Sequence, residues 1–170
     1  MRVLKINVVE IIMFHEVKRI KQVISVDECH RILEEELRGV LSVITEDGYP
    51  YGMTMNHYFV KDENRIYFHS GRFGHKIDCM KANNKCSFTV IQKDKSDNDD
   101  WYLTFKSVIV FGKIHFLEDK NKIAEISRSL SRKFTKDEAY IDAEIIKFLD
   151  TTSMFYIEIE HITGKTVKEN

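Results

Sequence analysis

The sequence predicts a single, mainly β domain: a small antiparallel barrel of six strands with a few peripheral helices. Three observations support this fold class. Six segments are rich in β-branched and aromatic residues, and short turns join the first three of them. Only one proline and seven glycines interrupt the 170 residues, with no internal repeat or linker. A sheet of this kind has to close or be covered to hide its edges.

The first half of the chain is expected to begin with a helix over residues 26–38. Ser25 and Glu28 have the spacing of a capping box, and apolar residues then recur at helical intervals as far as Gly39. Three strands are expected next, over residues 40–45, 49–60 and 66–70. Since the short turns "EDG" and "KDEN" connect them, these strands are predicted to form an antiparallel meander.

The second half alternates strands and helices. A short helix is expected to begin after Gly74 and to end near residue 83. Three further strands are predicted, over residues 86–92, 101–117 and 154–162. Two amphipathic helices are predicted between the last two strands, over residues 119–134 and 137–149. Gly112, inside a long apolar strand, indicates a bend or a bulge.

Composition excludes several classes of function. The chain has 26 lysine and arginine residues against 27 aspartate and glutamate residues, so it has no general attraction for nucleic acid or for a membrane surface. The three cysteines lack CxxC spacing, which argues against disulfides and a zinc site and favours a cytoplasmic location. A signal peptide is not expected, because Glu10 interrupts the first apolar run and no small-residue cleavage site follows. The sequence contains no apolar run of membrane-spanning length and no HExxH, GxSxG, Walker or GxGxxG motif.

The stretch "IYFHSGRFGHKID", residues 66–78, carries the strongest chemical signal. A chain that enters a helix through Gly74 presents free backbone amides at the positive end of the helix dipole. Lys76 adds a charge, and the side chains of Ser70, Arg72 and His75 add donors, so the phosphate of a nucleotide-type cofactor would fit. The alternative is an ordinary turn whose basic residues are only solvated.

The stretch "MTMNHY", residues 53–58, is unusually polar and aromatic for a structural strand. Asn56 can both donate and accept hydrogen bonds, as a flavin edge requires, and methionines suit an aromatic face. Alternatively, Met53 and Met55 are ordinary core residues. His69 precedes the phosphate-like turn and is therefore a candidate contact for a cofactor or a substrate, although strand histidines are commonly structural.

Four segments in order, "GVLSVITEDGYPYGMTMNHYFV", "IYFHSGRFGHKIDCMKANNKCSFTV", "SVIVFGKIHFLED" and "YIEIEHITGK", resemble the 5-nitroimidazole-reductase-related branch of the pyridoxamine-phosphate-oxidase-like flavoproteins. The resemblance runs from about Met13 to Lys165. It implies a six-stranded antiparallel split β-barrel and a homodimer. It also implies a flavin, usually FMN and alternatively FAD, in each of two clefts between the subunits.

Carried over position by position, the resemblance implies a set of flavin contacts. They are Met53, Thr54, Met55, Asn56 and His57 on one strand, Phe68, His69 and Ser70 on the next, Arg72, His75 and Lys76 at the phosphate, and Lys106 and Ser107 from the other subunit. Two departures are visible: Thr54 stands where this branch often has proline, and Met53 stands where the true oxidases have a phosphate-binding arginine. The arginine-rich C-terminal segment of those oxidases is also missing, so oxidation of pyridoxamine phosphate is disfavoured.

The resemblance also divides the chain into residues 13–170, a single flavin-binding domain, and residues 1–12, which we expect to be a dispensable extension. Deleting residues 1–12 is expected to leave flavin content and melting temperature unchanged. A large loss of either quantity would contradict this expectation.

The function implied is that of a flavin-dependent oxidoreductase. It would take electrons from a reduced nicotinamide or another donor and pass them to a small electron-poor acceptor such as a 5-nitroimidazole. His69 is the candidate catalytic residue. A non-catalytic protein of the same fold that stores or senses flavin is the alternative, and a haem or deazaflavin ligand is a third reading, with His57, His69 or His75 as potential axial ligands.

Overall fold

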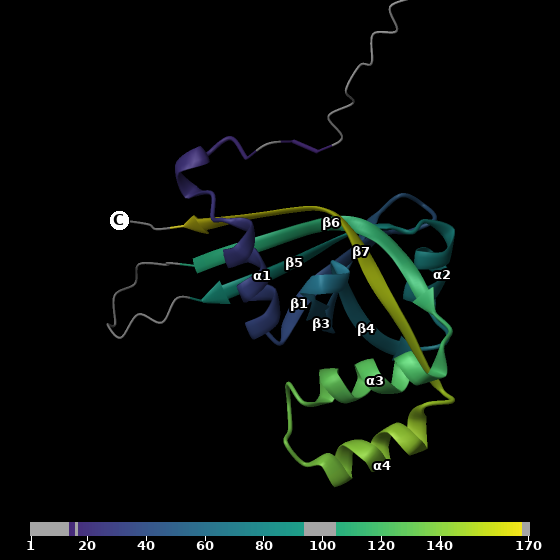
Figure 1. Cartoon of the computed structure of the whole chain (residues 1–170). Helices are drawn as coiled ribbons and strands as arrows, with labels where there is room; N and C mark the ends of the chain where they lie inside the picture. Colours follow the sequence, from purple (N-terminus) through teal and green to yellow (C-terminus); the bar gives the residue numbers. More distant parts are fainter. Residues whose placement is uncertain (1–13, 16, 94–104, 168–170) are drawn as a thin grey trace, which may run out of the picture.

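The computed structural model describes residues 14, 15, 17–93 and 105–167, which form one seven-stranded antiparallel sheet with helices around it (Figure 1). The strands are β1 (Arg38–Ile44), β2 (Pro50–Asn56), β3 (Tyr58–Val60), β4 (Arg65–Gly71), β5 (Lys85–Lys93), β6 (Phe105–Leu117) and β7 (Thr152–Val167). The helices are α1 (Val26–Glu35), α2 (His75–Ala82), α3 (Lys120–Ser131) and α4 (Glu138–Phe148), with 3-10 turns η1 (Ile20–Gln22) and η2 (Lys61–Glu63). The predicted mainly β class is confirmed. Residues 1–12 and the start of the strand predicted over 101–117 lie outside the described ranges.

The order of the strands shows that the sheet is a split barrel. It runs β2-β1-β5-β6-β7-β4-β3, so β2 and β3 lie at opposite edges although only His57 separates them in the chain. The sheet therefore has to curl until its two edges approach each other. Every strand pair is antiparallel.

The predictions of six strands and of a meander are wrong at one place. The segment 49–60 is two strands: β2 pairs with β1, whereas β3 pairs with β4, and β4 pairs with β7 rather than with β2. His57 breaks the segment because its backbone amide donates to Leu37 O (3.4 Å) and its ring nitrogen Nε2 lies 2.8 Å from Leu33 O. Strand propensity is continuous over residues 49–60, so it does not indicate that the two halves of this segment pair with different strands.

Glycine at position 112 produces the predicted bulge. The register of β6 against β7 shifts between Phe111 and Gly112. A Cβ atom at Gly112 would lie 2.2 Å from the backbone oxygen of Glu158. The close approach of two backbones here is what bends the two longest strands across the whole molecule.

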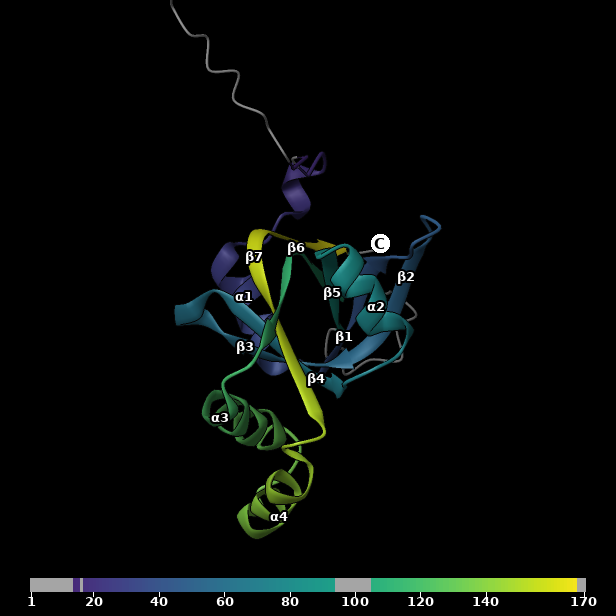
Figure 2. The same cartoon turned by 90° about the vertical axis from the view of Figure 1, so that its right-hand side faces the viewer.

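The apolar core has two parts, on either side of the curled sheet. The larger part fills the barrel with side chains such as Leu41, Phe68 and Phe88, and α1 contributes Ile32 and Leu33. The smaller part lies under α3 and consists of Tyr67, Ile123, Ile126 and Met154. In Figure 2 the α3–α4 hairpin projects from the barrel on this second side, while α1 and α2 lie at opposite flanks. As predicted, Ser25 caps α1, since its Oγ accepts from the amide of Glu28 at 3.2 Å.

The buried His57 is expected to make the fold sensitive to acid. Burial, and secondly the positive charge of Lys133, lower its pKa from 6.5 to about 4. Below pH 6.5 the unfolded chain takes up a proton that the folded chain does not, so this stability is complete above pH 6.5 and is lost as the pH falls through 4. The pKa difference corresponds to roughly 3 kcal/mol in the free energy of unfolding.

Urea unfolding of the wild type and of His57→Gln at pH 7.5 and pH 4.5 measures this contribution. The wild type is expected to be the more stable at pH 7.5, and its advantage is expected to shrink by about 2 to 3 kcal/mol at pH 4.5. An advantage of the same size at both pH values would show that His57 titrates normally.

Candidate functional site

The turn between β4 and α2 leaves the start of a helix without a side-chain cap. Gly74 is the N-cap of α2 with φ of +114°, a conformation that favours glycine, and it has no side chain to cap the helix. The other described α-helices are capped by Ser25, Asp119 and Asp137. A Cβ atom at Gly74 would meet no atom within 4 Å, so open space lies before the helix end. The first amides of α2 and the positive end of its dipole therefore face a site with room for a ligand.

Basic and polar side chains surround this turn. Arg72 and His75 are exposed and Lys76 is half-buried, and no carboxylate among the described residues lies within 4.0 Å of the cationic nitrogens of Arg72 or Lys76. Ser70 is only 8% exposed, and its Oγ has no hydrogen-bond partner in the described structure. A buried hydroxyl without a partner is costly, and a phosphate oxygen would satisfy it. The donors present thus fit a phosphate group.

His75 connects this turn to the β1–β2 hairpin. Its ring lies 5.2 Å from the ring of Tyr51, centroid to centroid, and its Nε2 lies 3.7 Å from the thiol of Cys79. It also lines a surface hollow with Asp47 and Tyr49 from the hairpin. Four of the residues predicted for the phosphate, Ser70, Arg72, His75 and Lys76, thus lie at one turn between β4 and α2.

The predicted contacts on β2 divide between the two faces of the strand. Met55 belongs to the barrel core and Met53 packs against it, which agrees with the alternative that these methionines are core residues. Thr54 is exposed and Asn56 is half-buried on the opposite face, which is open. Two of the predicted flavin residues can therefore reach a ligand on the open face.

His57 and Phe68 do not lie at the site. Both residues are 0% exposed, and their rings contact Phe88 inside the barrel. Neither residue leaves a surface for a ligand or an axial metal bond, because the inward side of each strand fills the core. We therefore leave His57 and Phe68 out of the site.

Lys106 and Ser107, expected to approach the flavin of the other subunit, point to opposite faces of β6. Lys106 Nζ lies 2.5 Å from Glu28 Oε1 of α1. Hydrogen bonds from Arg31 and then from Lys106 lower the pKa of Glu28 to about 2, so this carboxylate stays charged and holds the lysine. Ser107 lies on the same face of the sheet as Ile91, its partner in β5, but it is only 7% exposed. Neither Lys106 nor Ser107 is thus freely exposed in the way that the expected contact with a second subunit requires.

His69 faces away from the buried Ser70, because neighbouring strand residues alternate. It lines a cavity of about 280 Å³ together with Thr152 and with residues of α3 and α4 such as Leu130 and Glu144. Burial, and secondly the positive charge of Lys76, lower the pKa of His69, so its imidazole is neutral at pH 7. The sequence did not indicate that residues of α3 and α4 line this cavity. The amphipathic pattern of a helix identifies its buried face, but it does not identify which residues of that face border an open space.

A sequence model described as pyridoxamine 5'-phosphate oxidase matches residues 25–166, which is most of the chain. The chain belongs to this family. No functionally curated protein matches it in sequence.

Solved structures with the pyridoxamine 5'-phosphate oxidase fold include several close matches in shape. A candidate 5-nitroimidazole antibiotic resistance protein from Bacteroides thetaiotaomicron has a TM-score of 0.71 at 21% identity, over 86% of this chain and 87% of that one. An FAD-binding protein from Mesorhizobium loti has a TM-score of 0.61 at 23% identity, over 86% and 97%. An FAD- and haem-binding protein from Mycobacterium smegmatis has a TM-score of 0.69 at 16% identity, over 88% and 74%. At these identities the similarity establishes the fold.

Among the residues that the structure describes, no helix has the length and apolar character needed to cross a membrane. In the same ranges, no group of three or more histidine, cysteine, aspartate or glutamate residues is arranged to hold a metal ion.

Proposed function

We propose that this chain is a flavin-dependent oxidoreductase that reduces small, flat, electron-poor acceptors such as 5-nitroimidazoles. One observation carries the proposal in a member of this family: the start of α2 has no side-chain cap and lies beside the cationic Arg72 and Lys76 and beside the buried Ser70. Within the described ranges, neither cation has a carboxylate partner and the Ser70 hydroxyl has no hydrogen-bond partner. The similarity to proteins named as FAD-binding and as a candidate for nitroimidazole resistance supports it.

Different residues would bind the phosphate and the ring of the flavin. The amides at the start of α2, with Lys76, Arg72 and Ser70 Oγ, would hold the phosphate of FMN, and Thr54 and Asn56 on the open face would contact its ring. A bound flavin would supply electron transfer from a reduced nicotinamide or another donor to the acceptor. His69, neutral at pH 7, can donate one N–H hydrogen bond and accept a proton at its other ring nitrogen.

The open face of the sheet supports the proposed homodimer. One row of side chains crosses five neighbouring strands, and it consists of Thr54, Val40, Thr89, Ile109 and Thr163. On the same face Ile91 is 61% exposed, Val40 42% and Phe111 38%. Apolar side chains exposed together on one face of a sheet are typical of an interface, and the same face carries Thr54 and Asn56.

Val40→Lys is therefore expected to convert the proposed dimer to a monomer, because it places a charge within this row. Sedimentation velocity measures the change, and flavin content should fall with it. Ile146→Lys on α4 is the matched control, since Ile146 is 82% exposed and lies away from the open face. A Val40→Lys protein that sediments like the wild type would argue against this interface.

The catalytic part of the proposal is tested by anaerobic mixing of the reduced protein with a 5-nitroimidazole. Reoxidation followed at the flavin absorbance is expected to be at least tenfold faster than that of free reduced FMN at the same concentration. A rate no faster than that of free FMN, in a protein that does bind flavin, would instead support the alternative of a storage or sensing protein.

A further inference from the structure

The cavity beside His69 has walls of two different origins. β4 and the start of β7 form one wall, and the α3–α4 hairpin forms the other. Figure 1 shows the hairpin beside the ends of these two strands. α3 is held on the sheet by the smaller core, whereas α4 packs mainly against α3. The cavity volume of about 280 Å³ is at the lower limit of small-molecule sites, which suits a compound with a single ring.

The cavity lining is partly apolar and partly polar. Leu130 of α3 and Ile145 and Phe148 of α4 supply apolar contacts, so a ring that enters is removed from water. His69 and Glu144 line the same cavity and supply polar groups, as do Ser127, Ser131 and Thr152. An amphipathic ligand, with a ring and one polar group, matches this arrangement.

The carboxylate of Glu144 determines which polar group of a ligand the cavity would accept. Among the described residues, no ion pair or hydrogen bond to the carboxylate of Glu144 is formed. Three cations of the hairpin have other partners: Arg128 pairs with Asp142, Arg132 Nε lies 2.8 Å from Glu138, and Lys120 Nζ lies 2.6 Å from Asp150. Lys147, on the same helix as Glu144, lies over the ring of Phe148, with Nζ 4.7 Å from the ring centroid.

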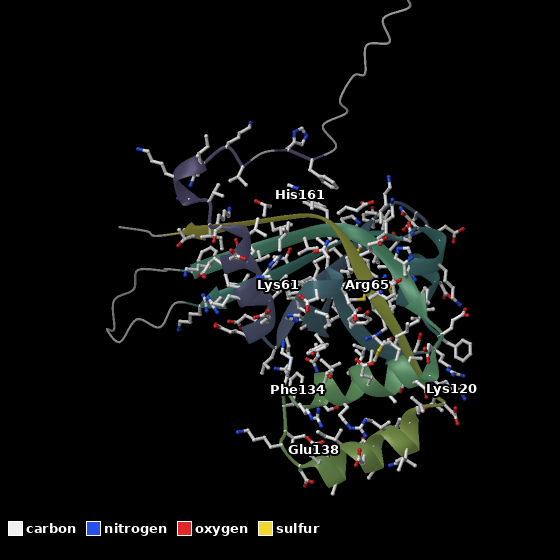
Figure 3. The ribbon with its side chains drawn as sticks, in the orientation of Figure 1. Lys61, Arg65, Lys120, Phe134, Glu138 and His161 are labelled. Atoms are coloured by element: carbon white, nitrogen blue, oxygen red, sulfur yellow. The ribbon has the colours of Figure 1, made fainter. Side chains whose placement is uncertain are left out.

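Figure 3 shows Lys120 and Glu138 at opposite ends of the hairpin. These pairs neutralise its two ends, and no side chain in the described ranges forms an ion pair with Glu144. His69 does not provide a counter-charge, because its imidazole is neutral at pH 7. A cationic group of a ligand would supply the missing charge, and a carboxylate would be repelled.

We propose that the cavity between His69 and Glu144 binds small single-ring compounds that carry a cationic amine, and that it rejects the corresponding carboxylates. This inference deepens the proposed function, and it rests on that function only in identifying the bound compound as the acceptor. Among electron-poor acceptors of similar size, those with a protonated amine would then be selected over anionic ones.

Three probes of the same size and shape test the proposal without any redox step: benzylamine, benzyl alcohol and benzoate. Isothermal titration calorimetry of the purified full-length protein, with whatever flavin it carries, is expected to show benzylamine binding at least tenfold more tightly than benzoate at pH 7. Since this readout needs no turnover, it can succeed in a protein whose flavin function fails, and the two failures remain distinguishable.

Glu144→Gln is expected to weaken benzylamine binding about tenfold and to change benzyl alcohol binding by less than threefold, because only the charge is removed. Glu125→Gln is the matched control, because it removes the same charge from α3 at a side chain that is 64% exposed and does not line the cavity. It should change neither the binding of benzylamine nor the binding of benzyl alcohol. Ser127→Leu, which fills the cavity, should abolish binding of benzylamine and benzyl alcohol. Equal binding of benzylamine and benzoate, or a Glu144→Gln protein that binds benzylamine like the wild type, would overturn the proposal.

Discussion

Replacing Lys76 by alanine is expected to raise the dissociation constant of flavin about ten- to a hundredfold. A hydrogen bond from a charged group contributes about 1.5 to 3 kcal/mol, and Lys76 has no competing carboxylate partner among the described residues. The lysine lies in the first turn of α2, where the helix dipole acts on the same anion. Fluorescence titration of the flavin-free protein with FMN measures the constant directly.

Lys81→Ala is the matched control, because Lys81 lies in the last turn of the same helix and carries the same charge. It should leave the dissociation constant within about a factor of two. Titrating riboflavin, which has no phosphate, gives a second check: Lys76→Ala should affect riboflavin binding much less than FMN binding. Equal effects on both ligands would show that Lys76 supports the turn and does not bind a phosphate.

Gly112→Ala is expected to cost at least about 3 kcal/mol in the free energy of unfolding, and it is the largest effect on stability that we expect from a single methyl group. The new Cβ atom would lie 2.2 Å from Glu158 O and 2.7 Å from Ile157 Cγ2. Neither β6 nor β7 can move away easily, since both lie in the interior of the sheet. Urea unfolding followed by circular dichroism measures the loss.

Gly71→Ala provides the comparison for Gly112→Ala. A Cβ atom at Gly71 meets nothing within 4 Å, so this change should alter the free energy of unfolding by less than about 1 kcal/mol. If both alanine variants unfold at the same urea concentration, the bulge does not depend on the close approach of the two backbones.

The sequence was a good guide where one local rule acts alone. Ser25 caps α1 because the cap needs only a hydroxyl beside the first turn, and Gly112 marks the bulge because only glycine fits there. The turn from Ser70 to Lys76 was also correctly placed, since a strand, two glycines and a helix follow each other without a gap. Local propensity and spacing are sufficient in these cases.

The sequence was a poor guide where distant segments compete. The segment 49–60 has strand propensity throughout, but its two halves pair with β1 and with β4 at opposite edges of the sheet. The direction of a side chain depends on that pairing, so His57, expected at the flavin, lies in the core. Lys106 likewise pairs with Glu28, which is 78 residues away in the chain. The cavity beside His69 needs β4 and the α3–α4 hairpin together, and no local pattern brings them into contact.

Flavin binding is tested by the visible absorbance spectrum of the freshly purified protein, followed by mass analysis of what heat denaturation releases. We expect the two absorbance bands of an oxidised flavin and the release of FMN. A colourless protein that also fails to bind added FMN or FAD would contradict this expectation, and the turn from Ser70 to Lys76 would then be a structural feature only.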